Sequence, residues 1–256
     1  MPEEPDTARW RLNAVAVRGS EHADAGRPCQ DAAGVWQSPQ MMVAACADGA
    51  GSRSRAQEGA AEAVDAAIER ARRASRAESS QGKLLEDPRA LARRCMGAAR
   101  GAVLRLAKAS AAPPALFATT LSLCIETPAG IAFAAIGDGV ICVKQGDALH
   151  APFPPQRGQY ANEAVFIDEG TRLPQVGLRL YARGDVDAFC LSSDGLAGLA
   201  TTHAYTGAPY QPFFDDLFDY LKRGGNAAGL TQFLERLGER DDTTLVVGVR
   251  EGRESK

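Results

Sequence analysis

The feature that most constrains this chain is an apolar run that stops at an acidic residue and a glycine, and it recurs along the sequence. Met41–Ser52 reads MMVAACADGAGS, an apolar run typical of a buried strand followed by a small-residue turn. Near the C-terminus the order reverses, and two acids open the run TTLVVGV. A carboxylate at a strand tip can face a cleft, so four such tips predict acids that converge on hard cations. The acids concerned are Asp48, Asp138, Asp194 and the pair Asp241 and Asp242.

A single Asp-Gly pair has a simpler explanation, because this dipeptide is most often a hairpin or loop signal. Gly49 lets the backbone turn sharply and leaves its carbonyl group accessible. The recurrence of the pattern, and not one copy of it, favours a shared site.

Composition excludes several classes of protein. In 256 residues the chain is 45% hydrophobic and 24% charged, which supports a folded core. The formal net charge of −3 and the lack of a long apolar run give no reason to expect nucleic-acid or membrane binding. Six cysteines without a CxxC pair are typical of free thiols in a reducing cytoplasm. The N-terminus lacks the order of a signal peptide, so we expect a cytoplasmic protein.

Periodicity predicts helices that are grouped and do not alternate with strands one for one. Asp87 and Pro88 are typical of a helix N-cap and first position. Residues 150–185 are irregular and resemble a surface flap with one short strand near Ala164–Ile167. The predicted helices cover about 54–77, 88–111, Pro212–Arg223 and Ala227–Leu237, and the predicted strands are Leu12–Val17, Ala33–Trp36, Met41–Ala47, Phe117–Glu126, Ile131–Ile136, Val140–Lys144, Ala188–Ser192 and Thr243–Val249.

This element order argues against a doubly wound parallel sheet. Short links between strands favour antiparallel pairing, and apolar runs on consecutive strands favour two stacked sheets with helices outside. We therefore predict an α+β fold in a single domain, residues 1–256, with its core at about 12–249.

Six segments in this order resemble the type 2C protein phosphatases, the metal-dependent Ser/Thr phosphatase family, and look most like its bacterial branch. The resemblance spans nearly the whole chain and implies an α-β-β-α sandwich with a metal cleft at one edge of its sheets. Each segment is short, and the ordered set carries the resemblance. The segments are PCQDA, ADGAGS, ATTLSL, AIGDG, SSDGL and RDDTTLVV.

The resemblance also implies roles for residues. Asp48 would bridge two Mn²⁺ or Mg²⁺ ions, one of which the Gly49 carbonyl would also bind, and Asp194 and Asp242 would bind the other. Asp31 would hold waters in an outer shell, and Asp138 would support a weaker third ion. The catalytic residues implied are Asp31, Asp48, Asp194 and Asp242. An all-oxygen donor set suits Mg²⁺ or Mn²⁺ better than zinc.

The chain departs from the family pattern around the expected phosphate. Ala50 stands where many members place His or Met, so no general acid follows the Asp-Gly pair. The family's phosphate-binding Arg would fall at Gly26, and Arg27 is one residue away. Gln30 replaces the usual Glu, and GDGV lacks the Arg of the common GDSR segment. The candidate substrate-binding residues are Arg27, His22 and Thr120, with Arg18 as a further substitute; Thr120 is alternatively an ordinary strand threonine.

The sequence thus predicts a phosphatase that hydrolyses phosphoserine and phosphothreonine in proteins with a water activated by two metal ions. Its expected partners are phosphoproteins made by a cognate Ser/Thr kinase, and the enzyme is expected to be a monomer. Two alternatives stay open. One is an inactive module of the same fold that binds phosphoproteins, and the other is a phosphatase for small metabolites.

Overall fold

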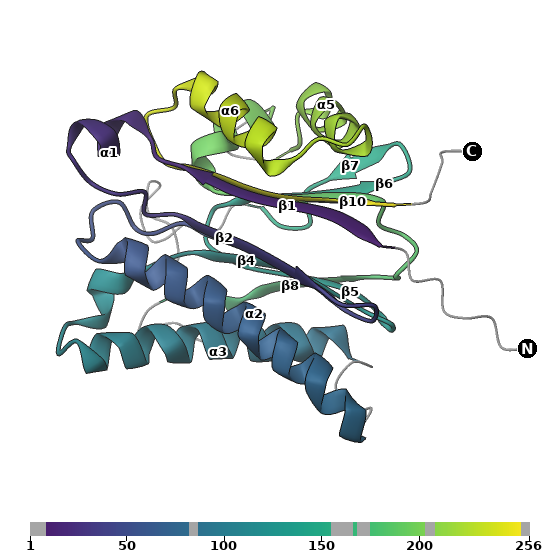
Figure 1. The fold of residues 1–256 in the computed structure, drawn as a ribbon, viewed down its shortest axis with the longest axis horizontal. Coiled ribbons are helices and arrows are strands. Elements are labelled where there is room, and N and C mark those ends of the chain that lie inside the picture. The colour runs from purple at the N-terminus through teal and green to yellow at the C-terminus, as the bar shows by residue number, and fades with distance from the viewer. Residues whose placement is uncertain (1–8, 82–86, 155–165, 168–174, 203–207, 252–256) are drawn as a thin grey trace, which may run out of the picture.

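The structure is a computed structural model that describes residues 9–81, 87–154, 166–167, 175–202 and 208–251 (Figure 1). Its strands form two five-stranded sheets in which all neighbours pair antiparallel. The first sheet has the order β1 (Trp10–Val17), β10 (Thr243–Arg250), β9 (Ala188–Ser192), β6 (Val140–Gln145), β7 (Ala148–His150). The second has the order β2 (Ala32–Gln37), β3 (Met42–Ala47), β4 (Leu121–Thr127), β5 (Gly130–Ile136), β8 (Gly177–Tyr181).

Helices cover the outer face of each sheet, so the predicted α-β-β-α sandwich is confirmed (Figure 1). The long helices α2 and α3 pack on the second sheet, and α5 and α6 pack on the first. A short helix α1 lies at the end of β1. The helices are α1 (Ser20–Asp24), α2 (Ala56–Gln81), α3 (Pro88–Ala109), α4 (Ala197–Ala200), α5 (Gln211–Lys222) and α6 (Ala227–Leu237).

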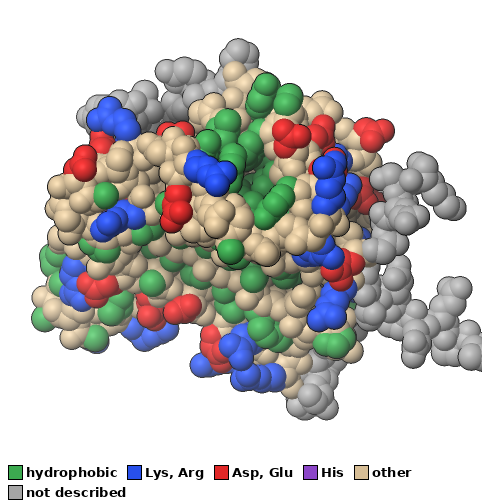
Figure 2. All heavy atoms as spheres, turned by 45° about the horizontal axis from the view of Figure 1, so that its top comes forward, with side chains coloured by type: hydrophobic (Ala, Val, Ile, Leu, Met, Phe, Trp, Pro, Cys, Tyr) green, Lys and Arg blue, Asp and Glu red, His purple; other side chains and the backbone are tan. Residues whose placement is uncertain are grey.

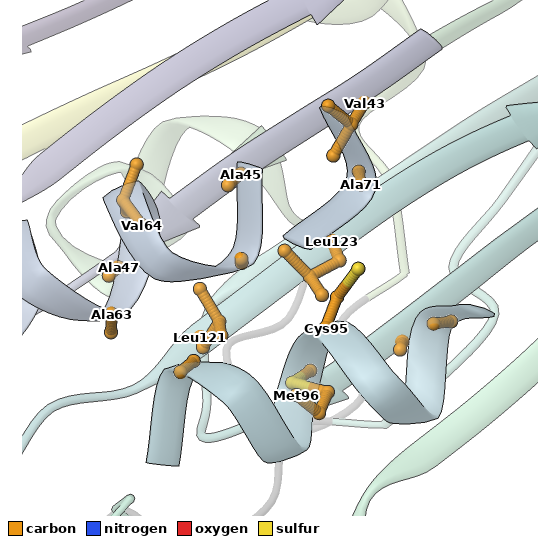
Figure 3. Close-up of a cluster of buried hydrophobic side chains, with 14 of the residues drawn as sticks. Val43, Ala45, Ala47, Ala63, Val64, Ala71, Cys95, Met96, Leu121 and Leu123 are labelled. Atoms are coloured by element: carbon orange, nitrogen blue, oxygen red, sulfur yellow. The ribbon is translucent and has the colours of Figure 1, made fainter. Parts of the chain in front are cut away.

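Small side chains let α2 and α3 lie close to the second sheet. Figure 3 shows alternate residues of β3 and β4 pointing at one face of each helix. In a strand, every second residue lies on the same face, and in a helix, residues three or four apart do. The labelled residues are Val43, Ala45, Ala47, Leu121 and Leu123 on the strands and Ala63, Val64, Ala71, Cys95 and Met96 on the helices. The α3 N-terminus is as predicted, because the Asp87 carboxylate accepts a hydrogen bond from Ala90 N at 3.0 Å.

The layer between the sheets is aromatic. The ring centroids of Trp10 and Phe189 are 5.1 Å apart, and those of Phe133 and Phe189 are 6.0 Å apart, both in edge-to-face geometry. At this end of the sandwich the buried Glu126 accepts hydrogen bonds from Trp10, Arg183 and Arg250. These contacts join the two sheets at the end opposite the Asp-Gly turns.

Three predictions about local structure need correction. The strands β5 and β6 do not pair, although only three residues separate them, because the chain crosses from one sheet to the other at Gly137. Part of the predicted flap is the edge strand β8, which pairs with β5. The stretch after β1, GSEHADAGRPCQD, is predicted from its sequence to be a polar loop but contains helix α1. The predicted strand Ala164–Ile167 lies mostly outside the described residues, and its last residue forms an isolated bridge with Thr119.

Helices α5 and α6 carry an apolar hollow on their outer surface (Figure 2). Its volume is about 530 Å³, and Tyr210, Tyr220 and Phe233 in its lining are each more than a third exposed. Among the described residues that line it, Asp216 is the one carboxylate. The hollow is therefore separate from the acids at the strand tips. None of the described helices is both long enough and apolar enough to span a bilayer.

Candidate metal centre

Four acids gather at one end of the sandwich because the strands that carry them are antiparallel neighbours. Asp31 precedes β2 and Asp48 follows β3, and these two strands pair through Ala32 and Ala47. Asp194 follows β9, and Asp241 lies two residues before β10, which pairs with β9. The two ends of each pair lie side by side, so segments far apart in sequence meet at the same edge.

The turn at Asp48 is held by two threonines that precede β4. The amide of Asp48 donates to Thr120 Oγ1 at 2.9 Å, and Thr120 N donates to the Asp48 carbonyl at 2.8 Å. Thr119 Oγ1 donates to the same carbonyl at 2.9 Å. A side chain at position 49 would meet the carbonyl of Gln30 at 2.6 Å, so this turn requires glycine. The backbone of Asp48 is therefore fixed on both sides, and its carboxylate is left for the cleft.

Burial and neighbouring negative charges raise the pKa of three of these acids. Burial raises the pKa of Asp48 well above its usual value, and the charges of Asp31 and Asp194 raise it further. Burial raises the pKa of Asp31 to about 7, against an opposing effect of the nearby Thr244 and Ser193 hydroxyl groups. The pKa of Asp241 is also raised, chiefly by partial removal of its carboxyl from water and also by the charge of Asp194. These four carboxyls therefore form one electrostatic cluster.

This cluster fits a cation. The Oδ2 atom of Asp31 and the Oε1 atom of Gln30 are buried oxygens without a hydrogen-bond partner. Buried oxygen acceptors are rarely left without a partner, and a divalent ion or its bound waters would supply one here. In the described ranges no three His, Cys, Asp or Glu side chains are already close enough to enclose an ion. The acids lie within electrostatic reach of one another without forming a closed coordination shell.

The structure gives Asp242 a different place from the one predicted for it as a metal ligand. Its side chain is buried, and both carboxylate oxygens are engaged with protein donors. The exposed member of the pair is Asp241, whose Oδ1 accepts a hydrogen bond from Asp242 N at 2.9 Å. The charge of Asp241 acts on Asp48, whereas that of Asp242 acts on Asp31. Asp241 is thus a candidate site residue outside the predicted ligand set, although the sequence shows the Asp-Asp pair that contains it.

Two of the predicted substrate-binding residues also have other partners. His22 is buried, and its Nδ1 lies 2.8 Å from Asp242 Oδ2. Thr120 is buried under the Asp48 turn and accepts the amide hydrogen described above. Both side chains are engaged by protein groups that build the site, so neither is positioned as an exposed phosphate ligand.

The two arginines lie beside the turn instead. Arg27 is exposed, and its Nη1 donates to the Gly51 carbonyl at 3.0 Å, three residues after Asp48. Arg18 Nη1 donates to the carbonyl of Arg27 at 3.3 Å. A guanidinium group is therefore present at the rim of the cluster even though the usual sequence position holds Gly26.

Asp138 lies in the crossing between β5 and β6. Gly137 has φ +116°, and a side chain there would meet Thr120 at 2.5 Å. A side chain at Gly139 would meet the Ser192 carbonyl at 2.7 Å. The crossing is thus packed between the segments that lead to Asp48 and to Asp194, which places the backbone of Asp138 at the same edge.

Comparisons with known proteins agree with this architecture. The family model of protein phosphatase 2C matches residues 18–235. The chain belongs to the protein phosphatase 2C family. It is 31% identical to Serine/threonine-protein phosphatase 3 of Escherichia coli (strain K12) over 235 residues, which cover 90% of this chain and 88% of the relative.

Solved structures share the protein phosphatase 2C fold. The serine/threonine phosphatase PstP/Ppp of Mycobacterium tuberculosis aligns with a TM-score of 0.62 and 17% identity, over 95% of this chain and 99% of that chain. The catalytic domain of PstP in complex with two manganese ions aligns with a TM-score of 0.58 and 18% identity, over 94% and 98%. PppA of Pseudomonas aeruginosa aligns with a TM-score of 0.62 and 18% identity, over 95% and 98%.

Proposed function

We propose that this protein is a metal-dependent phosphatase that hydrolyses phosphoserine and phosphothreonine in proteins. One observation carries the proposal: four acids from separate segments of a protein phosphatase 2C chain form an electrostatic cluster at the strand tips. Without cations, such a cluster repels itself in a site that is largely removed from water. Hard divalent ions remove that repulsion, and oxygen ligands favour Mn²⁺ or Mg²⁺.

Asp48, Asp194 and Asp241 are the proposed metal ligands, together with the Gly49 carbonyl. Asp31 would accept hydrogen bonds from waters in the outer shell, and Asp138 would support a third, weaker ion. A pair of divalent ions supplies an activated water and neutralises the phosphoryl oxygens. The chain's own contribution is to fix Asp48 by its threonine contacts and to exclude bulk water from Asp31.

Substrate contacts fall to the exposed rim. Arg27 can pair with the phosphate there, because a guanidinium group matches two phosphoryl oxygens at once. Ala50 is small and buried, so it offers neither a proton nor a charge to the leaving group. We expect this chain to depend more on charge neutralisation than on a general acid.

The direct test is hydrolysis of para-nitrophenyl phosphate with Mn²⁺, with Mg²⁺ and with chelator. We expect turnover with either ion, and its loss when the chelator is added. Inactivity of the folded protein with both ions would favour the phosphoprotein-binding module. Parallel reactions with phosphoserine peptides and sugar phosphates separate a protein phosphatase from a metabolite phosphatase, which would turn over the sugar phosphates faster.

Arg27→Ala is expected to raise KM for a phosphopeptide by about tenfold and to leave Mn²⁺ affinity unchanged, since one charge-assisted contact is worth about 1.5–3 kcal/mol. Arg27→Lys should recover part of the loss. Arg18→Ala serves as the matched control from the same rim. An unchanged KM in Arg27→Ala with a raised KM in Arg18→Ala would transfer the phosphate contact to Arg18.

The cysteines bear on the cellular setting. All six cysteines are free thiols, and five of them are buried, which is typical of a protein in a reducing compartment. We therefore propose a cytoplasmic monomer that reverses the action of a Ser/Thr kinase. Dephosphorylation of a kinase-phosphorylated protein is the matching assay.

A further inference from the structure

Asp242 touches the segments that carry the other acids of the cluster. Its Oδ1 accepts a hydrogen bond from Gly19 N at 2.8 Å, at the junction of β1 and α1. Its Oδ2 accepts one from Gln30 N at 2.6 Å and lies 2.8 Å from His22 Nδ1. Three groups from the connection between β1 and β2 therefore meet on one buried carboxylate.

The contact with Gln30 extends to two residues of the proposed metal centre. Gln30 directly precedes Asp31, and its carbonyl accepts a hydrogen bond from Gly49 N at 3.2 Å. The amide of Gln30 is thus held by Asp242, and its carbonyl in turn holds the Asp48 turn through Gly49. A shift of the Gln30 backbone would move Asp31 and Gly49 together.

The backbone of the Asp241-Asp242 segment is packed as tightly as its side chain. A side chain at Gly195 would meet the Asp242 carbonyl at 2.1 Å, and Gly195 directly follows Asp194. A side chain at Gly19 would meet the Asp241 carbonyl carbon at 2.3 Å. Ser193 Oγ also donates to the Asp242 carbonyl at 3.4 Å. Asp242 therefore contacts, and helps to position, the segments that carry Asp194, Asp31 and Asp241.

His22 completes this arrangement. An ionised carboxylate only accepts hydrogen bonds, so His22 Nδ1 carries the hydrogen in this contact. The amides of Ser20 and Glu21 donate to the carbonyls of Glu239 and Arg240, both at 3.0 Å. The N-terminus of helix α1 is thereby attached to the loop that precedes Asp241, and His22 covers the buried Asp242 carboxylate.

We propose that His22 and Asp242 form a positioning pair that presets the acid cluster for divalent cations and does not itself bind metal or phosphate. This inference rests on the proposed function. Outer-shell partners of metal ligands typically change metal affinity by about 10–100-fold when they are removed. Asp242 acts one step further out, through Gln30, Gly19 and the neighbouring Asp241, and should have an effect of the same order.

Isothermal titration with Mn²⁺ on the His22 variants tests the pair without reference to activity. His22→Leu keeps the volume and removes the donor, and it should weaken Mn²⁺ binding by about tenfold or more. His22→Asn places an amide donor near the position of Nδ1 and should stay within about threefold of wild type. Equal affinities in wild type and His22→Leu would overturn the proposal.

Stoichiometry separates positioning from direct ligation. Asp242→Asn should still bind two ions, each more weakly, because an amide cannot accept from all three donors. Asp241→Asn should lose one ion. If Asp242→Asn loses one ion and Asp241→Asn keeps two, Asp242 is a ligand and the positioning role is wrong.

Glu126→Gln is the matched control for a buried carboxylate that accepts three hydrogen bonds at the other end of the sandwich. It should lower the melting temperature measured in chelator and leave Mn²⁺ affinity unchanged. Failure of the wild type to bind Mn²⁺ would instead defeat the proposed function, and the inference with it. If the wild type binds Mn²⁺ and the His22→Leu and Asp242→Asn variants bind it with the same affinity, the inference is wrong but the proposed function stands.

Discussion

Asp48→Asn is expected to lower kcat for para-nitrophenyl phosphate by about 10³-fold or more at saturating Mn²⁺. Asp48 is the acid on which the charges of Asp31, Asp194 and Asp241 all act. An amide carries no charge and presents a hydrogen-bond donor on one side, so it cannot serve as a ligand shared by two cations. The measurement is the steady-state rate across a Mn²⁺ titration.

The same variant should be at least as stable as wild type in chelator, and this result separates lost chemistry from lost folding. Burial and like charges raise the pKa of Asp48, so its ionised form destabilises the metal-free fold at neutral pH. Asp216→Asn is the matched control, because Asp216 is an exposed acid on α5 at the apolar hollow. A variant at position 48 that keeps more than a tenth of wild-type kcat would contradict the metal-ligand role.

The sandwich was predictable because its signals are local. Helix α6 has the bounds that periodicity predicts, and β9 does as well. The Asp87 cap and the apolar runs of β3 and β4 also carry their own evidence in consecutive residues. The helices are grouped and the strands are closely spaced in sequence. This order favours two stacked antiparallel sheets, an arrangement that buries both faces of each sheet.

The features that were missed depend on contacts between distant segments. A three-residue link is short enough for a hairpin, yet Gly137 packs on Thr120 and sends the chain to the other sheet. The strand β8 has half-buried and exposed residues and is ordered by its pairing with β5. Helix α1 has five residues and is attached through backbone contacts to Glu239 and Arg240. Local propensity contains none of this information.

The choice between Asp241 and Asp242 shows the same limit at the site. Adjacent residues at a strand start point in different directions, and the sequence does not say which direction is the cleft. Glycine at position 19 allows its amide to reach Asp242. His22 supplies another partner, which lies 2.8 Å from the Asp242 carboxylate although the two residues are 220 positions apart in sequence. Asp242 is buried only once the strands have assembled. The sequence therefore points to the pair Asp241 and Asp242 but does not show which of the two faces the other acids.

The effect of pH on stability is expected to depend on metal. Raising the pH should destabilise the metal-free protein and stabilise the Mn²⁺-saturated protein. In chelator, the melting temperature of wild type relative to Asp31→Asn should fall by roughly 6–12 °C between pH 4.5 and pH 7.5. The raised pKa of Asp31 is worth about 3 kcal/mol over this range, and each kcal/mol moves the melting temperature by roughly 2–4 °C in a protein of this size. The pKa of Asp31 is raised to about 7 in the folded protein, from an ordinary value of 3.8. Between these values the folded state holds a proton that the unfolded state has lost, so the free energy of unfolding falls as the pH rises.

With saturating Mn²⁺ the slope should reverse, because cations bind the ionised carboxylates and stabilise the folded state by mass action. The comparison with Asp31→Asn removes the titration of the other acids, which both proteins share. Differential scanning calorimetry at five pH values, with Mn²⁺ and with chelator, provides both curves. The opposite result would be a melting temperature of wild type, relative to Asp31→Asn, that rises with pH in chelator. It would show that protein groups alone stabilise the ionised Asp31 carboxylate, so that the acid cluster would not need a cation to offset its charge.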